Sequence, residues 1–351
     1  MKKKIAILGS TGSIGTTSLN IFKKNKNKFD IILLAANRNY SLICKQIKVF
    51  KPKYYIINDE LVFKKVKKKY ENKKIKIFNN FSDLNFKKKK FDITISSIVG
   101  IAGLSPTIKF VKYSKKILLA NKETIICGWH LIKNLSKSHK TKIIPVDSEH
   151  FSIDQLTRNY KDTDIEKIYL TASGGPFLNK PLKSFKSIKA SDAIKHPKWK
   201  MGKKISIDSS NLMNKVLEII EAYRLFPFKI DKYEIIIHPQ SLVHAIVHFK
   251  NGQTRFLYHE TDMKIPISNA IFGNDFDKTN FIYPKKDILK KFENLKFIKV
   301  DKKRFPIVTL LKKFSNNNSA PIILNASNET LVYKFIEGKI SFKSIFFYLR
   351  S

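Results

Sequence analysis

Three acidic residues have the types and spacing of a divalent-metal site. Asp147 and Glu149 follow the apolar run KIIP. If this run continues as a strand, residues i and i+2 point to the same face, so both carboxylates would meet at one place. Two carboxylates that close repel each other unless a cation lies between them. Together with Glu218 they offer oxygen ligands that suit Mg²⁺ or Mn²⁺.

The segment MNKVLEIIEAY, which contains Glu218, has helical spacing. Its apolar stripe consists of Val216, Ile219, Ile220 and Tyr223. At 100° per residue, Asn214 and Glu218 point to the opposite side, with Lys215 beside them. This spacing fits a solvent-exposed face with an incidental glutamate equally well. Glu221 lies on the same face and can be interpreted as an ordinary surface residue.

No cluster of cysteines and histidines has the spacing of a zinc site. Lone histidines are more often structural than metal-binding, and this applies to His150, His238 and His244. A ligand role stays open for His244 alone.

The segment ILGSTGSIG predicts a phosphate-binding loop. It places Gly9, Gly12 and Gly15 after an apolar strand and at the start of a helix. Glycines allow a tight turn and a close backbone approach, and the helix N-terminus offers free N–H groups to a pyrophosphate. The spacing is G-x-x-G-x-x-G rather than the commoner G-x-G-x-x-G. A glycine-rich turn without a ligand is the alternative.

The end of the next strand indicates which dinucleotide would bind. In NAD-binding domains an acidic residue there accepts the ribose 2′-hydroxyl. Here Asn37, Arg38 and Asn39 follow the run FDIILLAA. A cation beside the 2′ position favours a 2′-phosphate and therefore NADP.

The composition indicates a globular protein rather than a membrane protein. The 351 residues are 43% hydrophobic, which is enough for two or three domains, and no apolar run is long enough to cross a membrane. The chain has only two cysteines, and the apolar run after its basic start is too short for a signal peptide. We therefore expect a soluble cytoplasmic protein.

The net charge of +40, from 68 Lys+Arg against 28 Asp+Glu, admits two interpretations. One is nucleic-acid binding. The favoured one is a lysine-rich composition spread over solvated faces, because the lysines are interleaved with ordinary helix and strand patterns. In either case the positive field attracts anions such as phosphates.

The order of the predicted elements indicates an α/β protein. Residues 1–150 alternate short strands with helices, which predicts a Rossmann-like parallel sheet. We expect an α+β catalytic domain at 151–272 with a mobile loop at about 185–203, a linker at 273–298, and a small C-terminal helical domain at 299–351. Within the catalytic domain, SSNLMNKVLEIIEAYRLF is predicted to be one helix, and YEIIIHP, HAIVHFK and QTRFLYH antiparallel strands.

A series of long motifs, spread over about residues 5–275, resembles one known family. The motifs are GSTGSIG, LLANKE, PVDSEH, TASGGPF, HPKWKMGKKISIDSSNLMNKVLEIIEA and HPQSLVH. They are similar to those of the 1-deoxy-D-xylulose 5-phosphate reductoisomerases. That resemblance implies an NADPH- and metal-dependent rearrangement and reduction of 1-deoxy-D-xylulose 5-phosphate to 2-C-methyl-D-erythritol 4-phosphate, in non-mevalonate isoprenoid synthesis.

The resemblance also implies roles for individual residues. The metal ligands would be Asp147, Glu149 and Glu218, and the catalytic residues Lys122, Glu149 and His196. The substrate would contact Lys122, Ser148, Glu149, Ser173, His196, Ser209, Asn214, Lys215 and Glu218. The cofactor would contact Thr11, Gly12, Ser13, Ile14, Asn37, Arg38, Asn39, Asn121, Glu123 and Gly202. The HPKW loop, with Trp199, would close over the substrate.

The sequence departs from this family in two places. Asn37 stands where glycine is more common, and the chain ends soon after KISFKSIFFYLRS, so we expect a shortened C-terminal domain. Family members are commonly homodimers. Two rival functions are another NADP-dependent dehydrogenase of a phosphorylated substrate, which would share the glycine-rich loop but leave the three carboxylates unexplained, and a basic nucleic-acid-binding protein.

Overall fold

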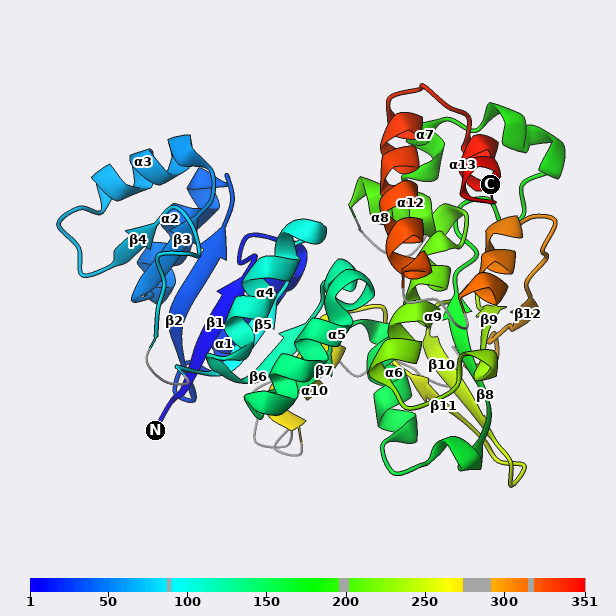
Figure 1. The fold of residues 1–351 in the computed structure, drawn as a ribbon, viewed down its shortest axis with the longest axis horizontal. Coiled ribbons are helices and arrows are strands. Elements are labelled where there is room, and N and C mark those ends of the chain that lie inside the picture. Colours follow the sequence, from blue (N-terminus) through cyan, green and yellow to red (C-terminus); the bar gives the residue numbers. More distant parts are fainter. Residues whose placement is uncertain (87–89, 196–201, 274–291, 315–318, 351) are drawn as a thin grey trace. The chain divides into compact units, whose positions relative to one another are not determined.

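The computed structural model describes residues 1–86, 90–195, 202–273, 292–314 and 319–350 (Figure 1). The chain forms two compact units. The first contains residues 1–147 and the segment that begins at Met263. The second contains Ser148–Asp262 and the segment that begins at Lys285.

The first unit is built on a parallel sheet of seven strands. The strand order is β4-β3-β2-β1-β5-β6-β7. The strands are β1 (Lys3–Leu8), β2 (Phe29–Ala36), β3 (Tyr54–Ile57), β4 (Lys76–Phe78), β5 (Phe91–Ser96), β6 (Ser114–Leu119) and β7 (Lys142–Pro145). The helices are α1 (Ser13–Lys24), α2 (Tyr40–Phe50), α3 (Glu60–Lys69), α4 (Leu104–Val111), α5 (Lys122–Ser138) and α10 (Lys264–Phe272), with a short 3₁₀ turn η1 (Ile101–Gly103). The expected Rossmann-like sheet is confirmed.

Alternate residues of β1 show why this sheet needs helices on both faces. Ile5 and Ile7 belong to one apolar cluster, with residues of α1, α2 and α10. Ala6 and Leu8 belong to another, with Phe110 of α4. Since all four are fully buried, β1 is a central strand covered on both sides, as parallel sheets require. Strands β2 to β4 are added on one side of β1, and strands β5 to β7 on the other. The strand order therefore switches between β1 and β5, and α/β folds bind their ligands at such a switch point.

Helix α10 belongs to the first unit, although the sequence-based division placed it in the catalytic domain. Its residues Ile267 and Ile271 are buried in the cluster that contains β1. The Lys116 ammonium of β6 also donates to the carbonyl of Ala270 at the end of this helix, at 2.7 Å. An apolar helix offers many equivalent packing partners, so local sequence does not specify which sheet it covers.

The second unit contains a mixed sheet of five strands in the order β11-β10-β8-β9-β12. The strands are β8 (Ile165–Ala172), β9 (Tyr233–Ile237), β10 (Val243–Phe249), β11 (Thr254–Tyr258) and β12 (Ile298–Lys299). Strand β10 is antiparallel to β8 and β11, as expected, but β9 is parallel to β8. Strand β9 is antiparallel to its other neighbour, β12, so the antiparallel prediction holds for that pairing and fails only for the pairing with β8. A strand's direction depends on its crossover connection, here through the helices between β8 and β9.

The helices of the second unit are mostly short. They are α6 (Ser148–Thr157), α7 (Ala190–Ala193), α8 (Lys203–Ser210), α9 (Met213–Leu225), α12 (Ala320–Ile336) and α13 (Phe342–Arg350), with 3₁₀ turns η2 (Asp162–Asp164), η3 (Leu182–Ser187), η4 (Ile230–Lys232) and η6 (Pro306–Lys313). The single helix expected from Ser209 onward is two helices, α8 and α9. Leu212 between them has φ 67°, a left-handed conformation that breaks the helical path.

The C-terminal helices share a core with the second unit. Val332 and Phe335 of α12 and Ile345 of α13 pack with Phe185 and Ile207 in one apolar cluster. The described part of residues 299–351 is therefore grouped with the catalytic segment. Most of the expected linker, residues 274–291, lies outside the described residues, so the three-domain division stays a prediction.

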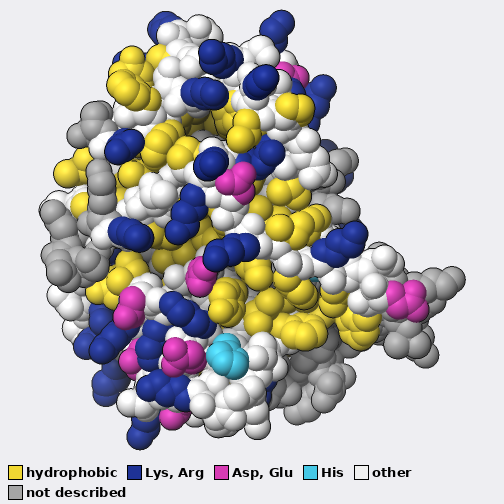
Figure 2. Space-filling model, turned by 90° about the vertical axis from the view of Figure 1, so that its right-hand side faces the viewer, with side chains coloured by type: hydrophobic (Ala, Val, Ile, Leu, Met, Phe, Trp, Pro, Cys, Tyr) yellow, Lys and Arg dark blue, Asp and Glu magenta, His cyan; other side chains and the backbone are white. Residues whose placement is uncertain are grey.

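The surface charge is dispersed on the face drawn in Figure 2. Lysine and arginine side chains are scattered there among apolar, acidic and neutral ones. Among the described residues, no helix is both long and apolar enough to cross a membrane.

Candidate active site

The three predicted metal ligands do come together. One carboxylate oxygen from each of Asp147, Glu149 and Glu218 lies within 4.8 Å of the others. The local geometry differs from the expectation, because β7 ends at Pro145 and α6 begins at Ser148. Asp147 therefore precedes a helix and Glu149 lies in its first turn, rather than both lying on one face of a strand.

Helix α9 carries Glu218 in a fully packed environment. Glu218 and Glu221 are each only 2% exposed, whereas Tyr223 of the expected apolar stripe is 40% exposed. The interpretations of Glu218 as an incidental surface glutamate and of Glu221 as an ordinary surface residue were therefore wrong. The helix contacts α6, α8, β8 and β9. Because these elements surround it, its polar side is buried as well as its apolar side.

Two lysines neutralise part of this acidic cluster. The Lys215 ammonium lies 2.6 Å from Glu149 Oε1 and 2.5 Å from Glu218 Oε2. Burial by itself would lower the pKa of Lys215, but the two carboxylates outweigh burial, so the pKa is raised and the lysine stays charged. Lys122 of α5 pairs with Asp147 at 3.2 Å. Three carboxylates and two ammonium groups leave a net charge of about −1.

Neutral donors hold the remaining carboxylate oxygens. The Asn214 amide donates to Glu218 Oε1, and the Ser148 hydroxyl donates to Glu149 Oε2. His150, which is fully buried, bonds through Nε2 to the backbone carbonyl of Glu218 at 2.9 Å. His150 thus positions α9 through its backbone, as expected of a structural histidine.

The donor set fits a hard divalent cation. Mg²⁺ prefers six oxygen ligands at about 2.0–2.1 Å, so oxygens on opposite sides of the ion are about 4.2 Å apart. The observed limit of 4.8 Å between the carboxylate oxygens needs only small side-chain adjustments to reach this span. No cysteine or histidine joins the cluster in the described part of the chain, which disfavours zinc.

The glycine-rich turn after β8 follows the predicted substrate residue Ser173 and packs against the end of α8, which carries Ser209. Gly174 and Gly175 have φ of 82° and 65°, and the backbone N–H of Gly175 donates to the Ser173 hydroxyl at 3.1 Å. A Cβ on Gly175 would lie 2.9 Å from Ser210 Cα and 3.1 Å from the Ser209 carbonyl oxygen. Only glycine permits this approach, which places Gly175 against the end of α8.

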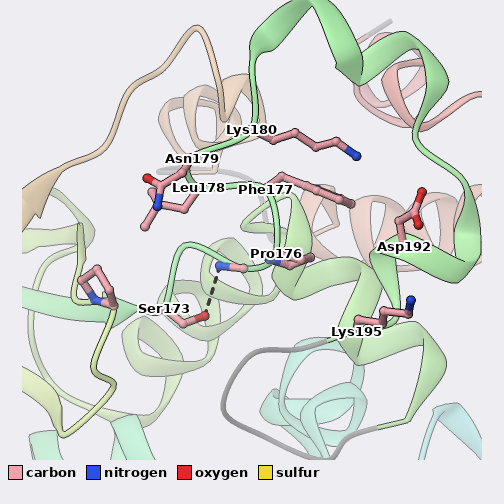
Figure 3. Close-up of a pocket in the computed structure, with 10 residues that line it drawn as sticks. Ser173, Pro176, Phe177, Leu178, Asn179, Lys180, Asp192 and Lys195 are labelled. Atoms are coloured by element: carbon pink, nitrogen blue, oxygen red, sulfur yellow. Dashed lines mark hydrogen bonds between the residues drawn. The ribbon is translucent and has the colours of Figure 1, made fainter.

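A pocket of 540 Å³ opens at this turn (Figure 3). It is lined by Ser173, Gly175, Pro176, Phe177, Leu178, Asn179, Lys180, Asp192, Lys195 and Pro239. Two lysines against one aspartate make its lining positive, which suits an anionic ligand. The predicted catalytic His196 and the loop residue Trp199 lie outside the described residues.

The glycine-rich loop after β1 has the expected form. Gly9 has φ 91°, and a Cβ on Gly15 would lie 2.3 Å from the Gly9 carbonyl oxygen. The loop and the first turn of α1 can pack this closely only because both residues are glycine. The predicted cofactor residues Gly12 and Ser13 are exposed at the start of α1, and Thr11 and Ile14 are half-buried.

A buried hydrogen-bond network supports this loop, and the sequence analysis missed it. Gln46 of α2 donates to the Ser10 carbonyl at 2.8 Å and accepts from the Ser10 hydroxyl at 2.8 Å. The Tyr55 hydroxyl donates to the same Gln46 oxygen at 2.7 Å. A buried glutamine at a helical position was the available signal, since such a residue needs partners.

The other expected cofactor residues lie at helix starts. Asn37, Arg38 and Asn39 are exposed after β2, and Asn39 caps α2 by accepting from the Leu42 N–H at 3.2 Å. Asn121 caps α5 and donates to the Ile98 and Gly100 carbonyls at 2.6 and 2.9 Å.

Two further residues complete the expected cofactor set. Glu123, in the first turn of α5, is 8% exposed. Gly202, in the second unit, precedes α8 as its N-cap. Their contact with a cofactor stays a prediction.

Comparison with known proteins identifies three matching family models that together span most of the chain. They are 1-deoxy-D-xylulose 5-phosphate reductoisomerase at residues 5–128, the C-terminal domain of that enzyme at 143–226, and the DXP reductoisomerase C-terminal domain at 259–350. The 1-deoxy-D-xylulose 5-phosphate reductoisomerase of Pelagibacter ubique is 47% identical over 98% of the chain and 89% of the relative, and that of Wolbachia pipientis wMel is 42% identical over 98% and 88%.

Solved structures agree with this match. The Zymomonas mobilis reductoisomerase in complex with NADPH superposes with a TM-score of 0.90 at 30% identity, over all of this chain and 91% of that chain. A DOX-P reductoisomerase in complex with NADPH, fosmidomycin and magnesium gives a TM-score of 0.89 at 32% identity, over 99% and 88%.

Proposed function

This chain belongs to the 1-deoxy-D-xylulose 5-phosphate reductoisomerase family, and from that premise we infer which of its residues carry the family's reaction. The protein is an NADPH- and divalent-metal-dependent enzyme that acts on 1-deoxy-D-xylulose 5-phosphate. We propose 2-C-methyl-D-erythritol 4-phosphate as its product. The nucleic-acid-binding alternative is not favoured, because the match covers the chain almost from end to end.

We propose that Asp147, Glu149 and Glu218 hold the metal. The convergence of their oxygens within 4.8 Å is the observation that carries this proposal. A metal in this position supplies Lewis-acid polarisation of substrate oxygens, and NADPH supplies the hydride. Lys122, paired with Asp147 at 3.2 Å, places a cation at the edge of the cluster, where it would bind and orient a substrate oxygen.

We propose that the substrate phosphate binds where the glycine-rich turn meets α8. Ser173 and Ser209 offer hydroxyl donors there, and the nearby pocket is positively lined by Lys180 and Lys195. Asn214 and Lys215, at the start of α9, supply further donors, and Ser148 lies beside Glu149. His196 stays a proposed catalytic residue on the family resemblance alone.

We propose that NADPH binds over the first turn of α1, with its 2′-phosphate beside Arg38. The exposed Gly12–Ser13 backbone at a helix N-terminus suits a pyrophosphate. Arg38 is exposed and is the cation nearest in sequence to the end of β2. No acidic residue stands at that end to select NAD.

We also propose a cytoplasmic homodimer. Cys44 and Cys127 are not joined in a disulfide, which suits a reducing compartment. Strand β11 is a sheet edge with Phe256 47% exposed, and the unpaired backbone groups of such an edge can pair with a second chain. Light scattering coupled to gel filtration tests the assembly, and a monomer at micromolar concentration would contradict it.

Substitution of one ligand tests the proposed metal site. In an NADPH-oxidation assay with 1-deoxy-D-xylulose 5-phosphate, we expect chelation to abolish turnover and Mg²⁺ to restore it. Glu218→Gln keeps the size of the side chain and removes its charge, and we expect it to lower Mg²⁺-dependent turnover at least about a hundredfold. The control is Glu234→Gln, at an exposed position of β9. Normal turnover in Glu218→Gln would remove this residue from the site.

A further inference from the structure

The side-chain amide of Gln46 is held at both of its ends. Its Nε2 donates to the Ser10 carbonyl at 2.8 Å, and its Oε1 accepts from the hydroxyls of Ser10 and Tyr55 at 2.8 and 2.7 Å. A backbone carbonyl can only accept, so the atom that faces it must be the amide nitrogen. Ser10 and Tyr55 are fully buried and Gln46 is 3% exposed. Water therefore cannot replace these bonds, and the amide has a single orientation.

The Ser10 carbonyl belongs to the peptide group that also carries the Thr11 N–H. This peptide is trans, so its C=O and its N–H point in opposite directions. Because Gln46 holds the carbonyl on the buried side of the loop, the N–H is turned toward the side where Gly12 and Ser13 are exposed. No carbonyl of the described residues accepts from this N–H. It is therefore an available donor at the start of α1.

The peptide groups on either side are held by backbone bonds instead. The N–H of Ser10 donates to the Ala35 carbonyl of β2 at 2.8 Å, and the N–H of Gly12 donates to the Gly9 carbonyl at 3.1 Å. The Ser10–Thr11 peptide between them depends on the side chain of Gln46 for its orientation. Loss of that side chain would leave the peptide able to rotate and its buried carbonyl without a donor.

We propose that Gln46 is a positioning residue for NADPH, which fixes the Ser10–Thr11 peptide so that the Thr11 N–H points at the pyrophosphate. This inference rests on the proposed place of NADPH over the first turn of α1. A donor that is oriented before the ligand arrives need not be ordered on binding, which strengthens affinity. NADPH and NADH share the pyrophosphate, so Gln46 acts on both alike, whereas Arg38 would act on NADPH alone.

Fluorescence titration with NADPH and with NADH, without substrate or metal, tests this role. Gln46→Leu removes the donor to the Ser10 carbonyl, and we expect it to raise the Kd for both dinucleotides about tenfold. The kcat at saturating NADPH and the KM for the phosphorylated substrate should stay near the wild-type values, because the bond acts on cofactor binding. Gln46→Met, which has an unbranched side chain, repeats the test if Gln46→Leu folds poorly.

Tyr55→Phe is the matched control within the same buried network. It removes the hydroxyl that donates to Gln46 Oε1 but leaves the bond from Gln46 Nε2 to the Ser10 carbonyl. It should therefore lower the unfolding temperature and bind both dinucleotides with the wild-type Kd. If Tyr55→Phe weakens binding as much as Gln46→Leu does, the effect comes from general packing and the role of Gln46 is overturned.

Ser13→Asp separates this inference from the proposed cofactor site. A negative charge at the first residue of α1 favours the helix but repels a pyrophosphate bound there, so we expect the Kd for NADPH to rise at least about tenfold. If Ser13→Asp binds NADPH like the wild type, the cofactor does not bind over α1 and the proposed site is wrong. If Ser13→Asp weakens binding but Gln46→Leu does not, the site stands and the role of Gln46 is overturned.

Discussion

The side-chain amide of Asn328 donates to Asp208 across 120 residues of chain, at 2.8 Å. Both residues are buried, Asn328 completely and Asp208 to 1% exposure. Asn328 lies on α12 and Asp208 on α8, one residue before the proposed phosphate ligand Ser209. Helix α12 is thus bonded directly to the helix that carries the proposed substrate residue Ser209.

Replacement of Asn328 by Ala should therefore affect both stability and substrate binding. Asp208 would keep Lys204, at 3.2 Å, but lose its buried amide donor. We expect the free energy of unfolding to fall by about 1–3 kcal/mol and the KM for the phosphorylated substrate to rise. Denaturant unfolding and steady-state kinetics measure the two effects. Thr330→Ala, at an exposed position of the same helix, is the control, and an unchanged Asn328→Ala protein would refute this coupling.

The sequence predicted those parts of the site that depend on local patterns. The glycine-rich loop follows from turn and packing requirements that are written within nine residues, and the structure has it as expected. The three carboxylates that the sequence grouped together also converge in the structure, although Glu149 lies on a helix and not on a strand. The choice between helix and strand for a short polar segment depends on what packs against it, and the run VDSEHF contains no such information.

Features that depend on contacts distant in sequence escaped prediction. The Lys215–Glu149 ion pair joins residues 66 positions apart in the chain. The burial of Glu221, the parallel pairing of β9 with β8 and the place of α10 in the first unit likewise follow from how whole elements pack. Hydrophobic periodicity indicates which face of a helix is apolar. A helix that is surrounded on all sides, such as α9, also buries the polar residues of its other face when they find hydrogen-bond partners.

The glycines of the phosphate loop should differ in their response to alanine. A Cβ on Gly15 would lie 2.3 Å from the Gly9 carbonyl oxygen, whereas one on Gly12 would lie at 3.5 Å. Gly15→Ala should therefore lower the free energy of unfolding by about 1–3 kcal/mol and weaken NADPH binding. Gly12→Ala should leave stability nearly unchanged. Thermal unfolding and fluorescence titration with NADPH check this contrast, and equal stability of the two variants would contradict it.

Arg38 should determine the preference for NADPH over NADH. It is exposed after β2, where a charged hydrogen bond to a 2′-phosphate would be worth about 1.5–3 kcal/mol. We expect Arg38→Ala to raise the KM for NADPH about ten- to a hundredfold and to change that for NADH little. Lys48→Ala, at an exposed position of α2, controls for loss of surface charge. An equal effect of Arg38→Ala on both cofactors would show that Arg38 does not contact the 2′-phosphate.

Lys116 should make the stability of the first unit depend on pH in the alkaline range. Burial, with smaller contributions from the positive charges of Lys3 and Lys142, lowers the pKa of Lys116 from 10.5 to about 8. Between these values the unfolded chain binds more protons than the folded chain, so the contribution of Lys116 to the free energy of unfolding rises with pH. Below the folded pKa of Lys116 the penalty for its buried charge is complete.

Comparison of the wild type with Lys116→Met isolates this contribution. The variant loses the hydrogen bond to the Ala270 carbonyl at every pH, but it also loses the charge penalty that the wild type carries below the folded pKa. The stability of the wild type relative to Lys116→Met should therefore increase between about pH 7 and pH 10, by about 1–2 kcal/mol once partial exposure is taken into account. Lys45→Met, at an exposed position of α2, should show no such trend. Denaturant unfolding at both pH values measures the difference. A difference that stays constant would mean that Lys116 keeps an ordinary pKa in the folded chain.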